Sequence, residues 1–170
     1  AKKQKEVKGK EKGFEPTNYK TIKEIFVRSK EKFADNVFIL EKFNPKEEFK
    51  EITYKEFCDD VIALGTALTN KYSLKDERIV IIGETTYNWY ISYMAMLCGV
   101  GIAVPTDKEL PANEIENVIN RSRATAVIYS GKKKDVIKKV ADKLPGVKYF
   151  IHNNIFYSLQ GINNFDKKND

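Results

Sequence analysis

The stretch from Met96 to Asp107, M-L-C-G-V-G-I-A-V-P-T-D, decides the fold class of this chain. It reads as the apolar end of a helix that runs through two glycines into a short apolar strand, which we expect to stop at Pro105. A helix followed at once by a buried strand is typical of an α/β protein with a parallel sheet. The neighbouring segments should therefore alternate strands and helices.

The segments on both sides of this stretch continue the alternation. Three strand–helix–strand units in series favour a right-handed, doubly wound, mainly parallel sheet flanked by helices. The apolar runs predict strands at 78–83, 102–104, 126–129 and 147–151, and the helical spacing predicts helices at 87–97, 111–121 and 133–144.

The first third of the chain has a different pattern. Thr21 is the expected N-cap of a helix whose apolar residues recur at spacings of three and four. Val37 to Phe43 and Phe49 to Tyr54 are β-prone runs separated by an Asn-Pro turn, so they predict an antiparallel hairpin. Thr53 and Glu56 then stand at the capping-box spacing before a long amphipathic helix. The predicted fold class is thus α/β, a doubly wound sheet with an N-terminal hairpin.

Composition places the chain among globular proteins and narrows its partners. The 170 residues are 42% hydrophobic, which is enough for one domain with a core. The net charge is +6, but the basic excess is concentrated in residues 1–12. We therefore expect a disordered basic arm at residues 1–18 and no nucleic-acid partner. Residues 19–153 should form the folded part, and residues 154–170 a tail or linker.

Cysteine spacing and hydropathy indicate the compartment. Cys58 and Cys98 lie in separate apolar helical segments, so no disulfide framework is expected. No segment has the uninterrupted apolar length of a membrane span, and the charged start lacks the apolar core of a signal peptide. We therefore expect a cytoplasmic protein.

Ligands of open parallel sheets gather beyond the carboxyl ends of the strands, which here means three loops. The loop at 83–86 has the pattern of an anion-binding helix start, but a plain strand-to-helix turn explains it as well. The loop at 105–110 follows the second strand. In the loop at 130–134, Lys132, Lys133 and Lys134 are either a solvated helix start or a phosphate contact.

Catalytic and metal-binding patterns are absent from the sequence. His152 is the one histidine and has no cysteine near it, so a zinc site is not expected. The serines lack a nucleophile-elbow context, and no carboxylate pair stands out as an acid and base. The sequence therefore names no catalytic residue and no metal ligand.

Several short sequence segments resemble the first core motifs of the AMP-forming adenylating enzymes. In chain order, these segments are I-T-Y-K-E-F at 52–57, I-V-I-I-G-E at 79–84 with Trp89 after it, G-V-G-I-A-V-P-T-D at 99–107, and E-L-P at 109–111 leading into N-E-I. The resemblance covers residues 19–153 and is greatest to the bacterial long-chain acyl-CoA synthetases, or fatty-acid CoA ligases. Other members carry P-L or P-I where this chain has Pro105 and Thr106.

The resemblance implies that this chain is the N-terminal subdomain of such an enzyme. The complete enzyme would use ATP, Mg²⁺ and CoA to join a carboxylic acid to AMP and pass the acyl group to CoA. Its partners would be fatty acid, ATP, CoA and the remaining subdomains. The family's Ser/Thr/Gly-rich phosphate loop and its C-terminal lid with a catalytic lysine do not occur in these 170 residues. The fragment alone is therefore expected to be inactive and to bind no cofactor tightly.

The resemblance also implies cofactor-binding residues. Thr106 and Asp107 fall on the segment that skirts the passage for the thiol arm of CoA. Lys132, Lys133 and Lys134 fall where several of these synthetases place basic residues against the phosphates of CoA.

Two other readings of the sequence stay open. One is a stand-alone doubly wound module of the flavodoxin or receiver kind, although Ile82-Gly83-Glu84 lacks the acidic strand end that a receiver needs. The other is a non-enzymatic interaction domain that forms a homodimer through an apolar helix or the hairpin edge. Peripheral membrane contact is a further open alternative.

Overall fold

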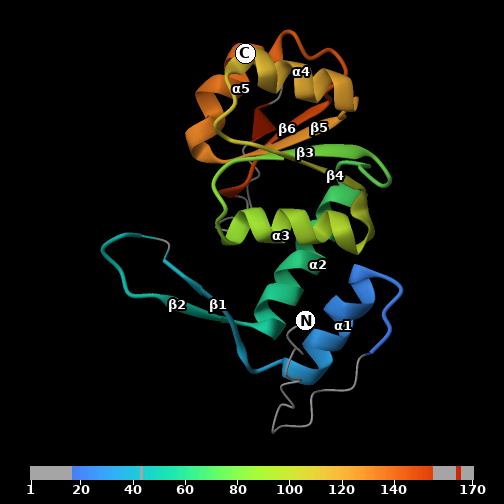
Figure 1. The fold of residues 1–170 in the computed structure, drawn as a ribbon, viewed down its shortest axis with the longest axis vertical. Coiled ribbons are helices and arrows are strands. Elements are labelled where there is room, and N and C mark those ends of the chain that lie inside the picture. Colours follow the sequence, from blue (N-terminus) through green and yellow to red (C-terminus); the bar gives the residue numbers. More distant parts are fainter. Residues whose placement is uncertain (1–16, 43, 155–163, 166–170) are drawn as a thin grey trace, which may run out of the picture.

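The computed structural model describes residues 17–42, 44–154 and 164–165 (Figure 1). The expected arm at 1–18 lies almost wholly outside the described residues, as does most of the expected tail at 154–170. The predicted α/β fold, with a parallel sheet and an antiparallel hairpin, is confirmed. The helices are α1 (Ile22–Phe33), α2 (Tyr54–Asn70), α3 (Tyr87–Ala95), α4 (Ala112–Ser122) and α5 (Lys134–Ala141). The strands are β1 (Val37–Glu41), β2 (Lys50–Thr53), β3 (Arg78–Ile82), β4 (Ile102–Thr106), β5 (Ala126–Tyr129), β6 (Tyr149–His152) and β7 (Asn164–Phe165).

The main sheet has the strand order β4-β3-β5-β6-β7. The four strands β4, β3, β5 and β6 run parallel, and β7 pairs antiparallel with β6. The chain passes from β3 to β4 on one side and then crosses β3 to reach β5 on the other side. Such a reversal is a topological switch point, and in open α/β sheets the crevice beside it binds ligands. The switch point of this chain lies between the carboxyl ends of β3 and β5.

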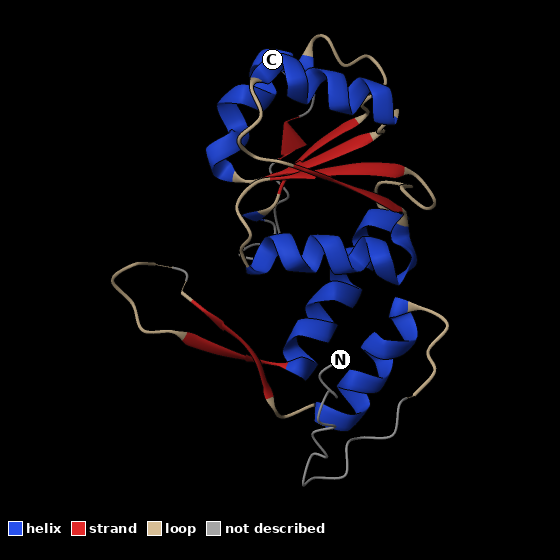
Figure 2. Cartoon of the chain, viewed as in Figure 1, coloured by secondary structure: helices blue, strands red, loops and turns tan. Residues whose placement is uncertain are grey.

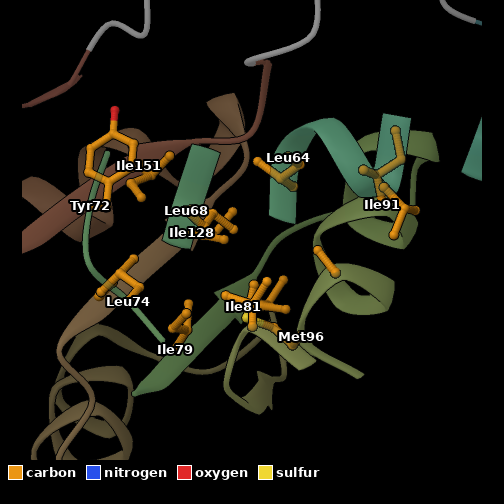
Figure 3. Packing of buried hydrophobic residues seen from close by; sticks show 14 of the residues in the cluster. Leu64, Leu68, Tyr72, Leu74, Ile79, Ile81, Ile91, Met96, Ile128 and Ile151 are labelled. Carbon is orange, nitrogen blue, oxygen red and sulfur yellow. The ribbon is translucent and has the colours of Figure 1, made fainter. Parts of the chain in front are cut away.

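Helices cover both faces of the sheet, which makes it doubly wound (Figure 2). Alternate residues of β3 point to opposite faces, so Ile79 and Ile81 pack with α2 and α3, whereas Val80 and Ile82 pack with α4 and α5. Figure 3 shows the first of these two cores, where Ile128 lies beside Leu68 of α2 and Ile81 lies beside Met96. Because both faces are covered, the strand is apolar at every position after Arg78.

The strand β4 corrects one expectation. The sequence predicts that this strand stops at Pro105, but β4 continues through Pro105 to Thr106. Pro105 lies opposite Ile81 of β3. In the described sheet β4 has β3 as its neighbour on one side and stands at the edge on the other, and an edge strand tolerates a residue without a backbone N–H. Edge position therefore outweighs the strand-breaking tendency of proline.

The helix that leads into β4 ends in an unusual turn. The sequence predicts one helix at 87–97, whereas α3 ends at Ala95 and continues as a π-helical turn, Met96–Val100. Gly99 adopts a φ of 115°, a left-handed conformation that glycine tolerates best. Gly101 then approaches the backbone of Glu77 so closely that a Cβ atom would lie 2.4 Å from the Glu77 carbonyl oxygen. The two glycines therefore turn the helix directly into the strand.

The local signals of the first third are confirmed. The Thr21 side chain accepts a hydrogen bond from the backbone N–H of Glu24 and caps α1. β1 and β2 pair antiparallel, and Thr53 and Glu56 form the reciprocal capping box at the start of α2. The hairpin extends away from the sheet (Figure 1). None of the described helices is both long and apolar enough to cross a bilayer.

Two smaller differences concern the end of the chain. The sequence predicts no strand after residue 152, yet β7 adds a fifth strand to the sheet within the segment expected to be a tail. The helix predicted at 133–144 is shorter, because Gly131–Lys133 forms a separate 3-10 turn before α5 and the helix ends at Ala141.

Candidate functional site

The carboxyl edge of the sheet brings together the three loops that the sequence predicts. These loops follow β3, β4 and β5, and side chains join them to one another. The Lys133 ammonium donates a hydrogen bond to the backbone carbonyl of Lys108 at 2.6 Å, which joins the β5 loop to the β4 loop. The Ser130 hydroxyl donates to the Glu84 carboxylate at 2.6 Å, which joins the β5 loop to the β3 loop. The candidate site is thus one connected edge.

Gly83 brings the β3 and β5 loops into contact. Its φ is 151°, and a Cβ atom at this position would lie 2.6 Å from both Cβ and Oγ of Ser130. Any other residue would collide with Ser130, which is itself buried. The backbone N–H of Ser130 also donates to the carbonyl of Ile82 at 3.1 Å. The loops after β3 and β5 are therefore in direct contact at the switch point.

Glu84 places a partly buried negative charge between the β3 and β5 loops. Burial raises the pKa of its carboxyl group, but the hydrogen bond from Ser130 and the positive charges of Lys132 and Lys108 outweigh burial and leave the pKa lowered. Glu84 is therefore ionised at neutral pH. Its charge interacts favourably with Lys132 of the β5 loop and Lys108 of the β4 loop.

Thr106 and Asp107, predicted to skirt the CoA passage, lie at the end of β4. Thr106 is buried, and its hydroxyl donates to the carbonyl of Val104 at 3.3 Å. Asp107 is exposed, and its carboxylate accepts a hydrogen bond from the backbone N–H of Glu109 at 2.9 Å. Both side chains therefore hold the local turn, and Asp107 remains open to solvent.

The three predicted lysines have different environments. Lys132 and Lys134 are exposed, whereas Lys133 is half-buried and reaches across to the β4 loop. Within the described residues, the ammonium groups of Lys132 and Lys134 have neither an ion pair nor a hydrogen bond. Two positive charges therefore remain available at this edge, while the third holds the loops together.

His152 ends β6 beside the same lysines. Its Nδ1 accepts a hydrogen bond from the backbone N–H of Asn154 at 3.2 Å, and its ring packs edge-on against Tyr129 with 5.5 Å between ring centroids. Burial lowers the pKa of the imidazole, and the charge of Lys134 lowers it further. A neutral ring that accepts at Nδ1 fits a structural role. Across the described residues, no three His, Cys, Asp or Glu side chains gather as a metal site would require.

The hydrogen bond between Ser130 and Glu84 is a feature of the candidate site that the sequence reasoning missed. The sequence leaves the β3 loop open between an anion-binding helix start and a plain turn, and it considers the serines only as nucleophiles. One signal was available, because both residues lie within two positions of the ends of β3 and β5, the strands that flank the switch point. Their hydrogen bond depends on the strand order, which the sequence does not specify.

Comparison with known proteins decides the family. The profile of the family described as AMP-binding enzyme matches residues 26–168, which is most of the chain. The chain belongs to the AMP-binding enzyme family. The long-chain-fatty-acid–CoA ligase 5 of Rattus norvegicus is 33% identical over 137 residues, which cover 78% of this chain and 20% of the relative. Long chain acyl-CoA synthetase 1 of Arabidopsis thaliana is 29% identical over 120 residues, covering 66% of this chain and 18% of the relative.

Solved structures share the fold. The anthranilate CoA ligase AuaEII, in complex with anthranoyl-AMP, superposes with a TM-score of 0.69 at 19% identity and covers 79% of this chain and 25% of that protein. The N-terminal subdomain of Klebsiella oxytoca NpsA superposes with a TM-score of 0.56 at 25% identity and covers 65% of this chain and 28% of that one. The chain thus spans about a fifth of the curated ligases named above.

Proposed function

We propose that this chain is the N-terminal subdomain of an ATP-dependent long-chain fatty-acid CoA ligase, which converts a fatty acid, ATP and CoA into acyl-CoA, AMP and diphosphate. The observation that carries the proposal is the family match over residues 26–168, together with relatives that are named as long-chain ligases. Within that enzyme, residues 19–153 are the folded subdomain and residues 154–170 lead to the next one. The expected compartment is the cytoplasm.

The chemistry of the proposed reaction needs groups that this chain lacks. Bound ATP would supply AMP as a leaving group that departs more readily than a carboxylate oxygen, and Mg²⁺ would offset the charge of its phosphates. The sequence contains no Ser/Thr/Gly-rich phosphate loop. We infer that the subdomain is inactive alone and that its hydrogen-bonded carboxyl edge forms one wall of a cleft completed by the rest of the enzyme.

The lysines of the β5 loop fit the phosphates of CoA. Lys132 and Lys134 are exposed and carry no ion pair among the described residues, so both can meet a phosphate without breaking an existing contact. Lys133 would position the loop through its bond to the Lys108 carbonyl. Thr106 and Asp107 would hold the turn of the neighbouring β4 loop beside the bound cofactor.

An apolar surface at the N-terminal end fits the remaining subdomains of the enzyme. Both α1 and the hairpin carry apolar side chains that are strongly exposed, and exposed apolar surface of this kind marks interaction sites. These side chains include Ile25, Phe33, Phe38, Leu40 and Phe49. A homodimer or peripheral membrane contact through this surface is the competing use, and size-exclusion chromatography of the full-length protein with and without vesicles separates the three.

The full-length protein tests the proposal. With Mg-ATP, CoA and palmitate it should form palmitoyl-CoA and AMP in equal amounts. Replacing Lys132 and Lys134 by alanine should raise the KM for CoA several-fold and leave the KM for palmitate unchanged, because only CoA phosphates meet these charges. Lys139→Ala, an exposed lysine on α5, is the matched control. Failure to form an acyl-CoA from any long-chain fatty acid contradicts the proposal.

A further inference from the structure

A second set of basic side chains lies at the amino edge of the sheet, opposite the candidate site. A surface hollow of about 380 Å³ opens there beside the start of β4. It is lined by Arg78, Arg121 and Arg123 together with Ile102, Val104 and Ser122. Three arginines thus surround one hollow, and none of the lining residues is acidic.

The fold brings these arginines together from distant parts of the sequence. Arg78 begins β3 and lies directly opposite Ile102, which begins β4. Ile102 and Val104 share the face of β4 that is packed against α4, because side chains two residues apart point the same way. Arg121 and Arg123 follow at the carboxyl end of α4. One strand and the end of one helix therefore supply the guanidinium groups that line the hollow, and β4 supplies its apolar side chains.

The charges of the three arginines are not neutralised by the protein. Throughout the described residues, none of the three guanidinium groups takes part in an ion pair or a side-chain hydrogen bond. Glu77 precedes Arg78 in the chain, but it does not line the hollow. Three neighbouring positive charges repel one another, so their convergence is a cost unless an anion offsets it.

Helix capping explains only part of this arrangement. The carboxyl end of a helix carries a partial negative charge, which favours Arg121 in the last turn and Arg123 at the C-cap of α4. Arg78 belongs to β3 and has no such role. Arg123 also holds a left-handed φ of 55°, a conformation that glycine or asparagine adopts at less cost than arginine. Capping alone therefore does not account for an arginine at these two positions.

We propose that this hollow binds a phosphate group. Guanidinium groups match phosphate oxygens with paired hydrogen bonds, and a phosphate dianion can accept from several arginines at once, whereas one arginine satisfies a carboxylate. The site is distinct from the edge that carries Lys132 to Lys134, and it does not depend on the proposed ligase activity. The phosphate belongs either to a small soluble molecule or to a lipid headgroup that also covers exposed Ile102.

Titration of the 170-residue protein with inorganic phosphate at constant ionic strength tests the proposal. Backbone amide NMR signals of residues 102–104 and 121–123 should shift in a saturable way, and sodium acetate should not reproduce the shifts. The variant R78Q/R121Q/R123N should weaken phosphate binding about tenfold or more, since each charged hydrogen bond contributes on that scale. Asparagine is chosen at 123 because it tolerates the left-handed backbone.

The matched control removes the same charge elsewhere. The variant K46Q/K50Q/K139Q also loses three positive charges, all from exposed positions away from the hollow, and should bind phosphate within about twofold of the parent. Equal weakening in both variants would mean unspecific attraction to a basic protein and would overturn the proposal, as would the absence of any saturable shift. The single variant R121Q, which alters one exposed side chain, repeats the test if the triple variant does not fold.

Vesicles distinguish the two sources of the phosphate. Sedimentation with phosphatidylcholine vesicles that contain phosphatidic acid should deplete the protein from solution if a lipid headgroup is the ligand, and R78Q/R121Q/R123N should stay in solution. Saturable phosphate shifts without sedimentation identify a soluble ligand. Sedimentation that the arginine variant retains overturns the lipid form of the proposal.

Discussion

The parallel sheet and the N-terminal hairpin both contain apolar strands, but they bury them to very different extents. In β3 and β5, Ile79, Ile81 and Ile128 are at most 1% exposed. In β1 and β2, Ile52 is buried, whereas Leu40 is 58% exposed, and Phe49 beside β2 is 60% exposed. Of the thirteen strongly exposed large apolar side chains in the described residues, nine precede β2.

The two regions differ in how far the described residues cover their apolar strands. Helices cover the parallel sheet on both faces, so its core needs no further protein. The hairpin packs one face against α2 and leaves the other face uncovered by the described residues. Apolar runs in the sequence therefore predict strands in both regions, but the apolar side chains of β3 and β5 are all buried, whereas several of those in the hairpin are exposed. Under the proposed function, the remaining subdomains of the enzyme would dock on the hairpin and α1.

The largest expected effect is the difference in unfolding free energy between an alanine substitution in the sheet and one in the hairpin. Ile81→Ala removes a side chain packed between the sheet and α3, and it should lower the free energy of unfolding by about 3 kcal/mol. Leu40→Ala in the hairpin should lower it by less than about 0.5 kcal/mol, because Leu40 is mostly exposed. Chemical denaturation of both variants measures the difference. Equal losses of unfolding free energy in the two variants would contradict the difference in burial between the sheet and the hairpin.

Gly83→Ala tests the contact between the β3 and β5 loops. A Cβ atom would collide with Ser130 while the backbone holds a positive φ, so unfolding free energy should fall by about 2 kcal/mol. Adding Ser130→Gly should restore part of that loss, since the colliding atoms are removed. A Gly83→Ala protein as stable as the parent would show that the two loops are not packed as described.

Thr53→Ala tests the junction between the hairpin and α2. The substitution removes the capping box with Glu56 and should cost about 1 kcal/mol of unfolding free energy. Thr66→Ala is the matched control in the same helix, because the Thr66 hydroxyl only donates to the carbonyl of Ile62 one turn earlier. Thermal unfolding of both proteins should separate them. A cost shared equally by the two would argue against the cap.

The smallest expected effect concerns Glu84 and pH. Its pKa is lowered in the folded protein, so its ionised form contributes stability above the ordinary value of 4.5, and that contribution is lost as pH falls through the folded pKa. Glu84→Gln should therefore cost up to about 1 kcal/mol at pH 7, with the difference from the parent shrinking in acid. Denaturation at pH 7 and pH 3 measures this. A difference that does not change with pH would exclude the ionised Glu84 as its source.

Features that depend on residues close together in the sequence were predicted correctly, whereas features that depend on strand order were not. The caps at Thr21 and Thr53 were predictable because a side chain bonds a backbone group three residues away. Pro105 was misread because its tolerance depends on β4 lying at the edge of the described sheet, and strand order is not a local property. The π-helical turn depends similarly on how Gly101 meets the backbone of Glu77.

The candidate site shows the same limit. The resemblance to adenylating enzymes points to the carboxyl edge of the sheet, where Lys133 joins two loops. The bond between Ser130 and Glu84 spans 46 residues and exists only because β5 lies beside β3. The arginines at the opposite edge form a group for the same kind of reason. Residues 78, 121 and 123 belong to no common sequence motif, and only the fold brings them to one hollow.

Fatty-acid-dependent exchange of labelled diphosphate into ATP tests the central claim most directly, because it reports formation of an acyl adenylate. The claim is that this chain is a scaffold whose reactive groups belong to other parts of the enzyme. The 170-residue protein with Mg-ATP and palmitate should give no exchange above a blank without protein, while the full-length protein gives exchange. Palmitate-dependent exchange by the 170-residue protein alone would contradict the account.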